Sequence, residues 1–252
     1  MDVKAAGEPA ICLKNIYTAY EGAEYPVIKD VSIEIRHGEF AIIGGPNGAG
    51  KTTLLETING MLKITHGEAK VLDMDVGSSG RDVRKRVGYV IQNFSFDPMT
   101  PFSAEEVVLM GRYGLIGPLK KPSGEDLEKA SDAMKLLGIT DIAKTPIGKL
   151  SGGQQQKVLI AQCIAKDPEI LLLDEPFSNL DLLTREYVSE VLGDLAKKGC
   201  TIVIVSHAFD ALPDTGIRII AMNDGKIALD ETCDPGEVEG KIRSVSGGSP
   251  RA

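Results

Sequence analysis

The segment from Gly45 to Thr52 constrains the fold of this 252-residue chain more than any other stretch. Its sequence, Gly-Pro-Asn-Gly-Ala-Gly-Lys-Thr, matches the phosphate-loop pattern G-x-x-x-x-G-K-S/T in full. The apolar run at 40–43 predicts a buried strand before the loop, and residues 53–58 predict a helix after it. Glycines let the backbone turn N–H groups toward a phosphate, and the helix N-terminus adds partial positive charge. The sequence therefore predicts an anion site on a strand–loop–helix unit.

Lys51 and Thr52 carry the chemical groups that a magnesium nucleotide needs. A lysine here supplies a full positive charge for the β- and γ-phosphates, and the threonine hydroxyl ligates Mg²⁺. A glycine-rich turn that matches by coincidence is the alternative, and the strand and helix on either side argue against it.

Composition excludes several other classes of protein. The net charge of −8 argues against a nucleic-acid binder, and the absence of Trp argues against base-stacking platforms. The four cysteines are far apart in sequence, which argues against a disulfide framework or a zinc site. The sequence shows neither a signal-peptide core nor an apolar run as long as a membrane span, so a role at a membrane requires a partner that spans it.

Candidate catalytic side chains follow two predicted strands. The apolar run 170–173 predicts a central parallel strand, and it ends at Asp174 and Glu175. Ligands of open α/β sheets bind at the carboxyl ends of strands, so Asp174 is placed to hold Mg²⁺ through water and Glu175 to polarise an attacking water. The acids alternatively cap the next element. His207 follows the strand 201–205 in the same way; a lone histidine is more often structural, but this position favours a catalytic one.

Three further signals are ambiguous when each is taken alone. Tyr20, upstream of the phosphate loop, either stacks on an adenine ring or packs locally at a strand end. Ser151 caps a helix that runs from Gln154 to Lys166, and the two glycines between them expose N–H groups as a second anion site or form an ordinary lead-in. Gln92 is a polar residue at a strand end.

The remaining chain predicts a helical insertion in an α/β protein. Strands are expected at 11–17 and 31–35, and composition changes after Gln92. Capping boxes at Ser103 and Ser123 begin two helices, the first expected to run through Arg112, within a helical subdomain at 93–166. A hairpin with a primed turn is expected at 223–225. The termini, 1–9 and 237–252, are expected to be flexible.

Together these motifs resemble the nucleotide-binding subunit of an ATP-binding cassette (ABC) transporter, over residues 11–235. The stretch Leu-Ser-Gly-Gly-Gln at 150–154 is the signature of that family, and the order of motifs matches. The resemblance implies an α/β P-loop NTPase with a RecA-like core sheet, an antiparallel β subdomain and a helical signature-motif subdomain. The ATPase domain would span 10–236, with ATP and Mg²⁺ as cofactors.

The resemblance also assigns roles to individual residues. The ATP phosphates would lie on Gly45, Pro46, Asn47, Gly48, Ala49, Gly50, Lys51, Thr52 and Thr53. The ATP site of the other protomer would be completed by Ser151, Gly152, Gly153 and Gln154. Tyr20 would stack on adenine, Asp181 would bridge the two sites, and His207 would contact the γ-phosphate. Glu175 would be the catalytic base, and Mg²⁺ would be held by Thr52, Gln92 and Asp174, with Gln92 also sensing the transmembrane partner.

The same resemblance implies a peripheral protein on the cytoplasmic face of the membrane. It would pair with an identical or related ATPase, drive an integral permease and serve a substrate-binding protein indirectly, without nucleic acid. Residues 97–103 and 107–114 resemble zinc and manganese uptake ATPases, with iron-siderophore and cobalamin ATPases as the near alternative. Two rival functions are a soluble cassette ATPase without a permease and an ATP-gated binding protein that hydrolyses poorly. The single cassette argues against the first, and an intact Glu175 and His207 argue against the second.

The permease is expected to dock near residues 93–117, because this stretch is unusually apolar. Its large apolar residues are Phe94, Phe96, Met99, Phe102, Leu109, Met110, Tyr113, Leu115 and Ile116. Phe and Met suit a groove that receives an amphipathic helix end. A small satellite core is the alternative.

Overall fold

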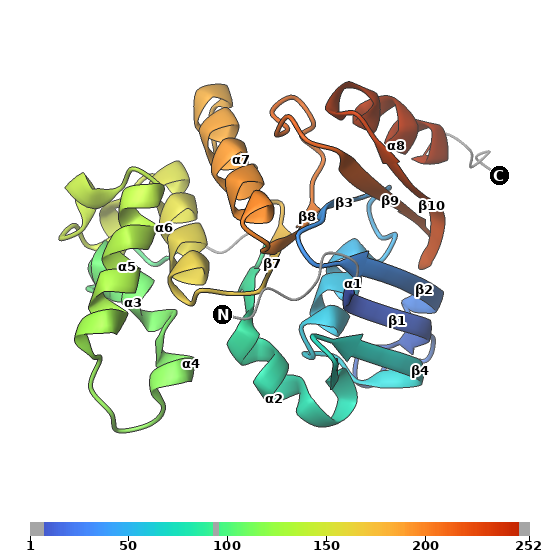
Figure 1. The fold of residues 1–252 in the computed structure, drawn as a ribbon, viewed down its shortest axis with the longest axis horizontal. Coiled ribbons are helices and arrows are strands. Elements are labelled where there is room, and N and C mark those ends of the chain that lie inside the picture. The colour runs from blue at the N-terminus through green and yellow to red at the C-terminus, as the bar shows by residue number, and fades with distance from the viewer. Residues whose placement is uncertain (1–7, 93–95, 247–252) are drawn as a thin grey trace.

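The computed structural model describes residues 8–92 and 96–246, and it contains two sheets flanked by helices (Figure 1). The larger sheet holds, in order, β10 (Lys226–Cys233), β9 (Ile217–Asn223), β3 (Phe40–Gly44), β8 (Thr201–Val205), β7 (Ile170–Asp174) and β6 (Val87–Val90). The smaller sheet holds β2 (Ile28–Arg36), β1 (Pro9–Thr18), β4 (Ile64–Val71) and β5 (Met74–Asp75). The expected combination of a core sheet with an antiparallel β subdomain is confirmed.

The central strands of the larger sheet are apolar on both faces, as their continuous hydrophobic runs predicted. β3, β7 and β8 are buried along their whole length and pair in parallel. Alternate residues of one strand enter different cores: Leu171 and Leu173 lie in one hydrophobic cluster, whereas Ile170 and Leu172 lie in the other. Side chains of a strand alternate between faces, so an uninterrupted apolar run is what a sheet covered on both sides requires.

The antiparallel parts also follow the sequence pattern. β2 alternates buried and exposed residues and pairs with β1. The turn between β9 and β10 has positive φ at Asp224 (46°) and Gly225 (79°), which is the primed turn expected there. Helix α1 (Lys51–Ile58) shares a hydrophobic cluster with strands of both sheets, through Leu54, Leu55 and Ile58. The phosphate-loop helix is therefore anchored to both sheets.

Residues 104–165 form the helical subdomain at the left of Figure 1. It contains α3 (Ala104–Met110), α4 (Tyr113–Ile116), α5 (Gly124–Leu136), two 3₁₀ turns (Thr140–Ile142 and Ile147–Lys149) and α6 (Gly152–Ala165). The capping boxes at Ser103 and Ser123 are confirmed. The expectation of one helix from Ser103 through Arg112 is wrong, since α3 ends at Met110. A Cβ on Gly111 would lie 2.0 Å from the carbonyl oxygen of Gln162, so close packing on α6 requires glycine at that position.

Two helices form where the sequence analysis expected none. The charged stretch 81–86 belongs to α2 (Val76–Arg86), which buries Val76 and Val83. Residues 238–246, expected to be part of a flexible tail, form α8 (Val238–Ser246) after a 3₁₀ turn at Pro235–Glu237. Val238 and Ile242 are one helical turn apart and at most 5% exposed, so α8 is held by apolar contacts on the sheet. The last long helix is α7 (Leu182–Lys197). Within the described ranges, no helix combines the length and apolar character that crossing a bilayer requires.

Candidate nucleotide site

The phosphate loop joins β3 to α1 in a backbone conformation that depends on glycine. Gly45, Gly48 and Gly50 have φ values of 135°, 80° and 98°. A Cβ on Gly45 would also lie 2.1 Å from the carbonyl oxygen of Met222 in β9, so a side chain is excluded there by sterics as well. Helix α1 begins at Lys51 without a side-chain cap, which leaves its first N–H groups available to an anion.

The Lys51 ammonium lies folded back on this loop. Its Nζ donates to the carbonyl oxygens of Gly45 at 2.9 Å and Pro46 at 3.0 Å, and the residue is 8% exposed. Burial lowers the pKa of Lys51, while the nearby carboxylates of Glu175 and Asp174 act in the opposite direction. The positive charge is thereby held where a phosphate group in the loop would meet it.

Thr52 and Asp174 form a direct pair although they are 122 residues apart. The Thr52 hydroxyl at the start of α1 donates to Asp174 Oδ2 at 2.7 Å, at the end of β7. Asp174 Oδ1 is buried and receives no hydrogen bond from the described part of the chain. Burial raises the pKa of Asp174, and the Thr52 hydrogen bond lowers it. A hydroxyl beside a carboxylate with a free buried oxygen suits a hard divalent cation such as Mg²⁺.

Glu175 and His207 meet at the carboxyl ends of β7 and β8. His207 Nε2 lies 3.4 Å from Glu175 Oε1, and the Glu175 side chain is 13% exposed. The Glu175 backbone is left-handed, with φ of 51°, and its N–H donates to the Val205 carbonyl at 2.9 Å. Burial raises the pKa of Glu175, whereas His207 opposes that rise. A non-glycine residue in this conformation is strained by about 1–2 kcal/mol, which indicates that the surrounding structure fixes its position.

Tyr20 is held against α1 by its hydroxyl group. The hydroxyl donates to Glu56 Oε2 at 2.7 Å and lies 3.2 Å from Thr53 Oγ1, while the residue is 43% exposed. Glu56 is a partner of Tyr20 that the sequence motifs did not indicate. Thr53 and Glu56 are three residues apart in α1, so helical periodicity places them on one face and is the signal that could have identified the pair.

Gln92 follows β6, the edge strand beside β7, and its side chain is exposed. It is thus on the side of the sheet where Asp174 ends β7. The adjoining residues 93–95 lie outside the described residues.

The signature segment forms a separate group. Ser151 caps α6: its Oγ accepts from the Gln154 N–H at 3.3 Å, and the Gln154 side chain accepts from the Ser151 N–H at 3.0 Å. A Cβ on Gly153 would lie 3.0 Å from the Asn179 carbonyl oxygen. Asp181, shortly after Asn179, caps α7 by accepting from the Thr184 N–H at 2.9 Å. The signature segment and Asp181 therefore lie near one another, whereas Figure 1 shows α6 and α1 on opposite sides of β7.

The stretch expected to receive a permease is only partly on the surface. Met99, Phe102, Tyr113 and Leu115 are 87%, 48%, 50% and 42% exposed. Phe96 is half-buried and packs, together with Leu109, on the hydrophobic cluster that contains Leu171 and Leu173. Phe94 lies outside the described residues.

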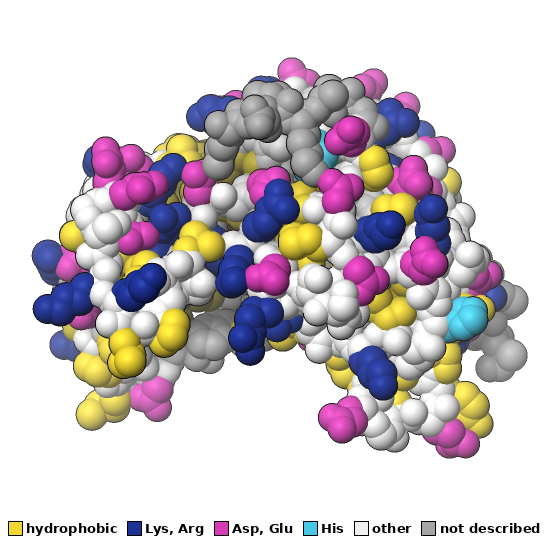
Figure 2. Space-filling view, turned by 60° about the horizontal axis from the view of Figure 1, so that its bottom comes forward, with side chains coloured by type: hydrophobic (Ala, Val, Ile, Leu, Met, Phe, Trp, Pro, Cys, Tyr) yellow, Lys and Arg dark blue, Asp and Glu magenta, His cyan; other side chains and the backbone are white. Residues whose placement is uncertain are grey.

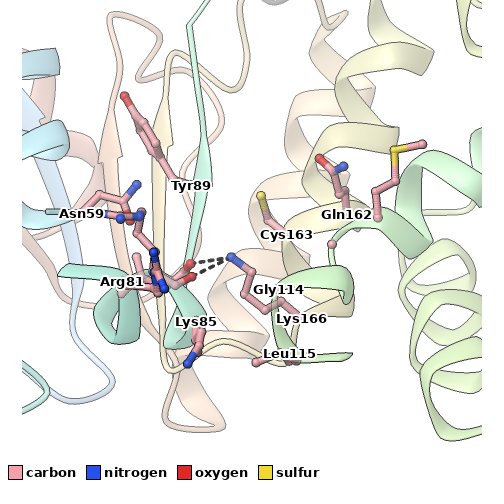
Figure 3. Close-up of a pocket in the computed structure, with 13 residues that line it drawn as sticks. Asn59, Arg81, Lys85, Tyr89, Gly114, Leu115, Gln162, Cys163 and Lys166 are labelled. Carbon is pink, nitrogen blue, oxygen red and sulfur yellow. Dashed lines mark hydrogen bonds between the residues drawn. The ribbon is translucent and has the colours of Figure 1, made fainter. Parts of the chain in front are cut away.

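A pocket of about 540 Å³ lies beside this stretch, between α2, α4 and α6. Met110 is one of its lining residues. Figure 3 shows Leu115 on one side of it and Arg81 and Lys85, from α2, on the other. In Figure 2 the pocket region belongs to a hollowed face in which Lys and Arg side chains gather near the middle.

A strand–loop–helix phosphate site with a lysine, a threonine–aspartate pair and a glutamate–histidine pair defines the class of P-loop ATPases. Comparison with known proteins identifies the family. The family model described as ABC transporter matches residues 28–178. The manganese transport system ATP-binding protein MntB of Bacillus subtilis is 37% identical over 235 residues, covering 93% of this chain and 92% of that protein. The zinc transport system ATP-binding protein TroB of Treponema pallidum is 34% identical, covering 87% and 80%.

Solved structures agree with this result. The dimeric structure of MJ0796, described as a bacterial ABC transporter cassette, has a TM-score of 0.75 and 32% identity, covering 88% of this chain and 98% of that one. The same cassette in a post-hydrolysis state bound to ADP and phosphate has a TM-score of 0.75 at 31% identity. The chain belongs to the ABC transporter family, in which it is an ATP-binding subunit that hydrolyses ATP for transport.

Proposed function

We propose that Glu175 is the general base of ATP hydrolysis and that His207 orients it and contacts the γ-phosphate. The contact between Glu175 and His207 at the carboxyl ends of two central strands is the observation that carries this assignment. Lys51 would leave its carbonyl partners and donate to the β- and γ-phosphates, while the loop N–H groups bind the same oxygens. Glu175 would accept a proton from a water whose oxygen attacks the γ-phosphorus, while the bond from that phosphorus to the β–γ bridging oxygen breaks and ADP leaves.

The proposal includes a bound Mg²⁺. Thr52 and Asp174 would hold it, with Gln92 approaching from the end of β6. The free buried oxygen of Asp174 supports the fit, since an unpaired buried carboxylate oxygen is costly without a partner. When bound, Mg²⁺ would neutralise charge on the β- and γ-phosphates.

We further propose that two copies of the chain, or this chain and a related ATPase, enclose two ATP molecules. One chain would have two anion sites, at the phosphate loop and at the N-terminus of α6, and α1 and α6 lie on different sides of β7. An ATP bound to the loop of one copy would reach the other site only in a partner copy. Ser151, Gly152 and Gly153 would then complete the partner's site, Asp181 would link the two, and Tyr20 would stack on adenine.

The ATPase would act from the cytoplasmic face of the membrane, as the peripheral subunit of a permease that docks near residues 93–117 and at the adjoining pocket. Because relatives covering most of the chain are named for manganese and zinc transport, we propose import of a divalent transition metal with the help of a substrate-binding protein. The domain would span 10–236, with the helical subdomain at 93–166.

The test is purification of the tagged chain with its permease, followed by reconstitution into vesicles that contain the binding protein. Uptake of manganese or zinc that requires ATP is the expected result. Uptake of a ferric siderophore without either metal ion would refute the cargo assignment, and a chain that hydrolyses ATP but associates with no membrane protein would refute the permease assignment.

A further inference from the structure

The pocket between α2 and α4 has a charge opposite to that of the whole chain. Its lining residues include Arg81, Arg84, Lys85 and Lys166, and no Asp or Glu is among the described residues that line it. The chain itself carries 36 Asp and Glu against 28 Lys and Arg. A basic concave surface on an acidic protein concentrates potential at one place, and it favours a ligand or partner of negative charge.

Two of the four cations are already engaged with the backbone. Lys166 Nζ donates to the carbonyl oxygens of Arg84 at 3.0 Å and Val87 at 2.9 Å, which are the dashed contacts in Figure 3. Arg84 donates from Nη1 to the carbonyl oxygen of Gly60. These contacts tie the end of α2 to α6 and to the loop after α1, so Arg84 and Lys166 have structural roles.

The other two cations are available to a partner. Lys85 pairs with Asp82 at 2.8 Å, but both side chains are largely exposed, and such a pair contributes little. The Arg81 side chain makes no hydrogen bond or ion pair with the rest of the chain that the structure describes. Cations near a helix C-terminus are favoured by the helix dipole, which is the simplest explanation for the basic residues at the C-terminal end of α2. Lys166 already binds the carbonyl oxygens there, so the dipole alone does not explain why a cation is present at position 81.

The wall of the pocket opposite the cations is apolar, and there is space next to the α4 backbone for an occupant. It includes Met110 and Leu115, and Leu115 is 42% exposed. Gly114 also lines the pocket, and a Cβ built on it meets no atom within 4 Å. An occupant can therefore approach the α4 backbone closely.

We propose that the permease segment that docks here is amphipathic, with carboxylates facing Arg81 and Lys85 and an apolar side chain facing Met110 and Leu115. This inference rests on the permease coupling proposed above and adds the chemistry of the partner. Electrostatic complementarity of this kind selects the correct partner and its register more than it adds affinity.

The test measures the dissociation constant between the chain and its detergent-solubilised permease by surface plasmon resonance. Arg81→Glu should weaken binding about tenfold, as reversal of a close interfacial charge does. Lys226→Glu, an exposed position on β10 at the far side of the molecule, is the matched control and should leave binding unchanged. Gly114→Leu should fill the pocket and weaken binding as well. Basal ATPase and thermal unfolding should be unchanged in Arg81→Glu and Gly114→Leu, since both residues line this pocket and neither belongs to the phosphate loop or to the Glu175–His207 pair.

Charge exchange then identifies the partner group. Each cytoplasmic Asp or Glu of the permease is replaced by Lys in turn and paired with Arg81→Glu, and one such pair should restore binding. If Arg81→Glu binds as tightly as the unmutated chain, or if no exchange restores binding, the proposed acidic segment is refuted while the permease coupling stands. If the unmutated chain does not bind the permease at all, the coupling itself fails. Binding to phosphatidylglycerol vesicles that is lost in Arg81→Glu, without restoration by any permease variant, would instead assign the pocket to the membrane surface.

Discussion

Replacement of Glu175 by glutamine tests the proposed mechanism with almost no change in shape. The side chain is 13% exposed, and its backbone conformation is supported by the hydrogen bond from its N–H to Val205 at 2.9 Å. Neither feature depends on the carboxylate charge. The variant therefore loses the carboxylate proposed to accept a proton from the attacking water and keeps the phosphate loop, Lys51 and Thr52 in place.

The substitution is expected to lower the rate of ATP hydrolysis and to raise the stability of the nucleotide-free fold at neutral pH. Loss of a positioned general base lowers turnover about 10²–10⁴-fold, equivalent to about 2.7–5.4 kcal/mol in the activation barrier. Burial raises the pKa of Glu175 above its unfolded value. The ionised carboxylate therefore destabilises the fold, and stability present at low pH is lost as pH rises through the raised pKa. At neutral pH the nucleotide-free glutamine variant should thus unfold at a higher temperature than the unmutated chain, and the difference should vanish below the ordinary glutamate pKa of about 4.3.

Phosphate release at saturating MgATP measures turnover, and calorimetry measures unfolding. Glu169→Gln is the matched control, because Glu169 precedes the same strand at its other end and accepts from Arg86 Nη2 at 2.7 Å. It should lose some stability and retain turnover. A Glu175→Gln variant that hydrolyses ATP at the unmutated rate, or that loses ATP binding as much as turnover, would refute the assigned role.

Three further predictions concern the second anion site, the loop and the helical subdomain. The Glu175→Gln chain should dimerise with ATP, and adding Ser151→Arg should abolish the dimer by filling the γ-phosphate position; light scattering that shows a dimer in both would contradict the head-to-tail arrangement. Gly45→Ala should lower the unfolding temperature more than Gly22→Ala, since both have positive φ but only Gly45 meets a backbone atom, at 2.1 Å; equal losses would mean that the contact relaxes freely. Hydrogen bonds from Ser123 and Arg112 lower the pKa of Asp126 to about 2, so its stabilisation is present above its ordinary 3.8 and lost toward pH 2. The stability gap between the unmutated chain and Asp126→Asn should therefore close across that range in acid titrations, and a constant gap would show that the depressed pKa has no effect on folding.

Local sequence determined the elements whose cause is local. The glycines and Lys51 of the phosphate loop, the capping boxes at Ser103 and Ser123 and the turn at Asp224 and Gly225 each act within a few residues, so their patterns predicted them correctly. The uninterrupted apolar runs predicted the central strands for the same reason, because burial on both faces leaves no polar position along the strand.

Only the tertiary structure decided the contacts between elements. The Thr52–Asp174 and Glu175–His207 pairs arise because α1 begins at the edge of the sheet where β7 and β8 end. No single segment of the sequence determines the order of these strands in the sheet. The close packing of Gly111 on α6 was missed because it depends on a neighbouring helix. Helix α8 was missed because its two apolar anchors are stabilising only where the sheet provides a surface for them. Sequence alone therefore identifies the chemical groups and their local geometry, whereas long-range packing determines which groups meet.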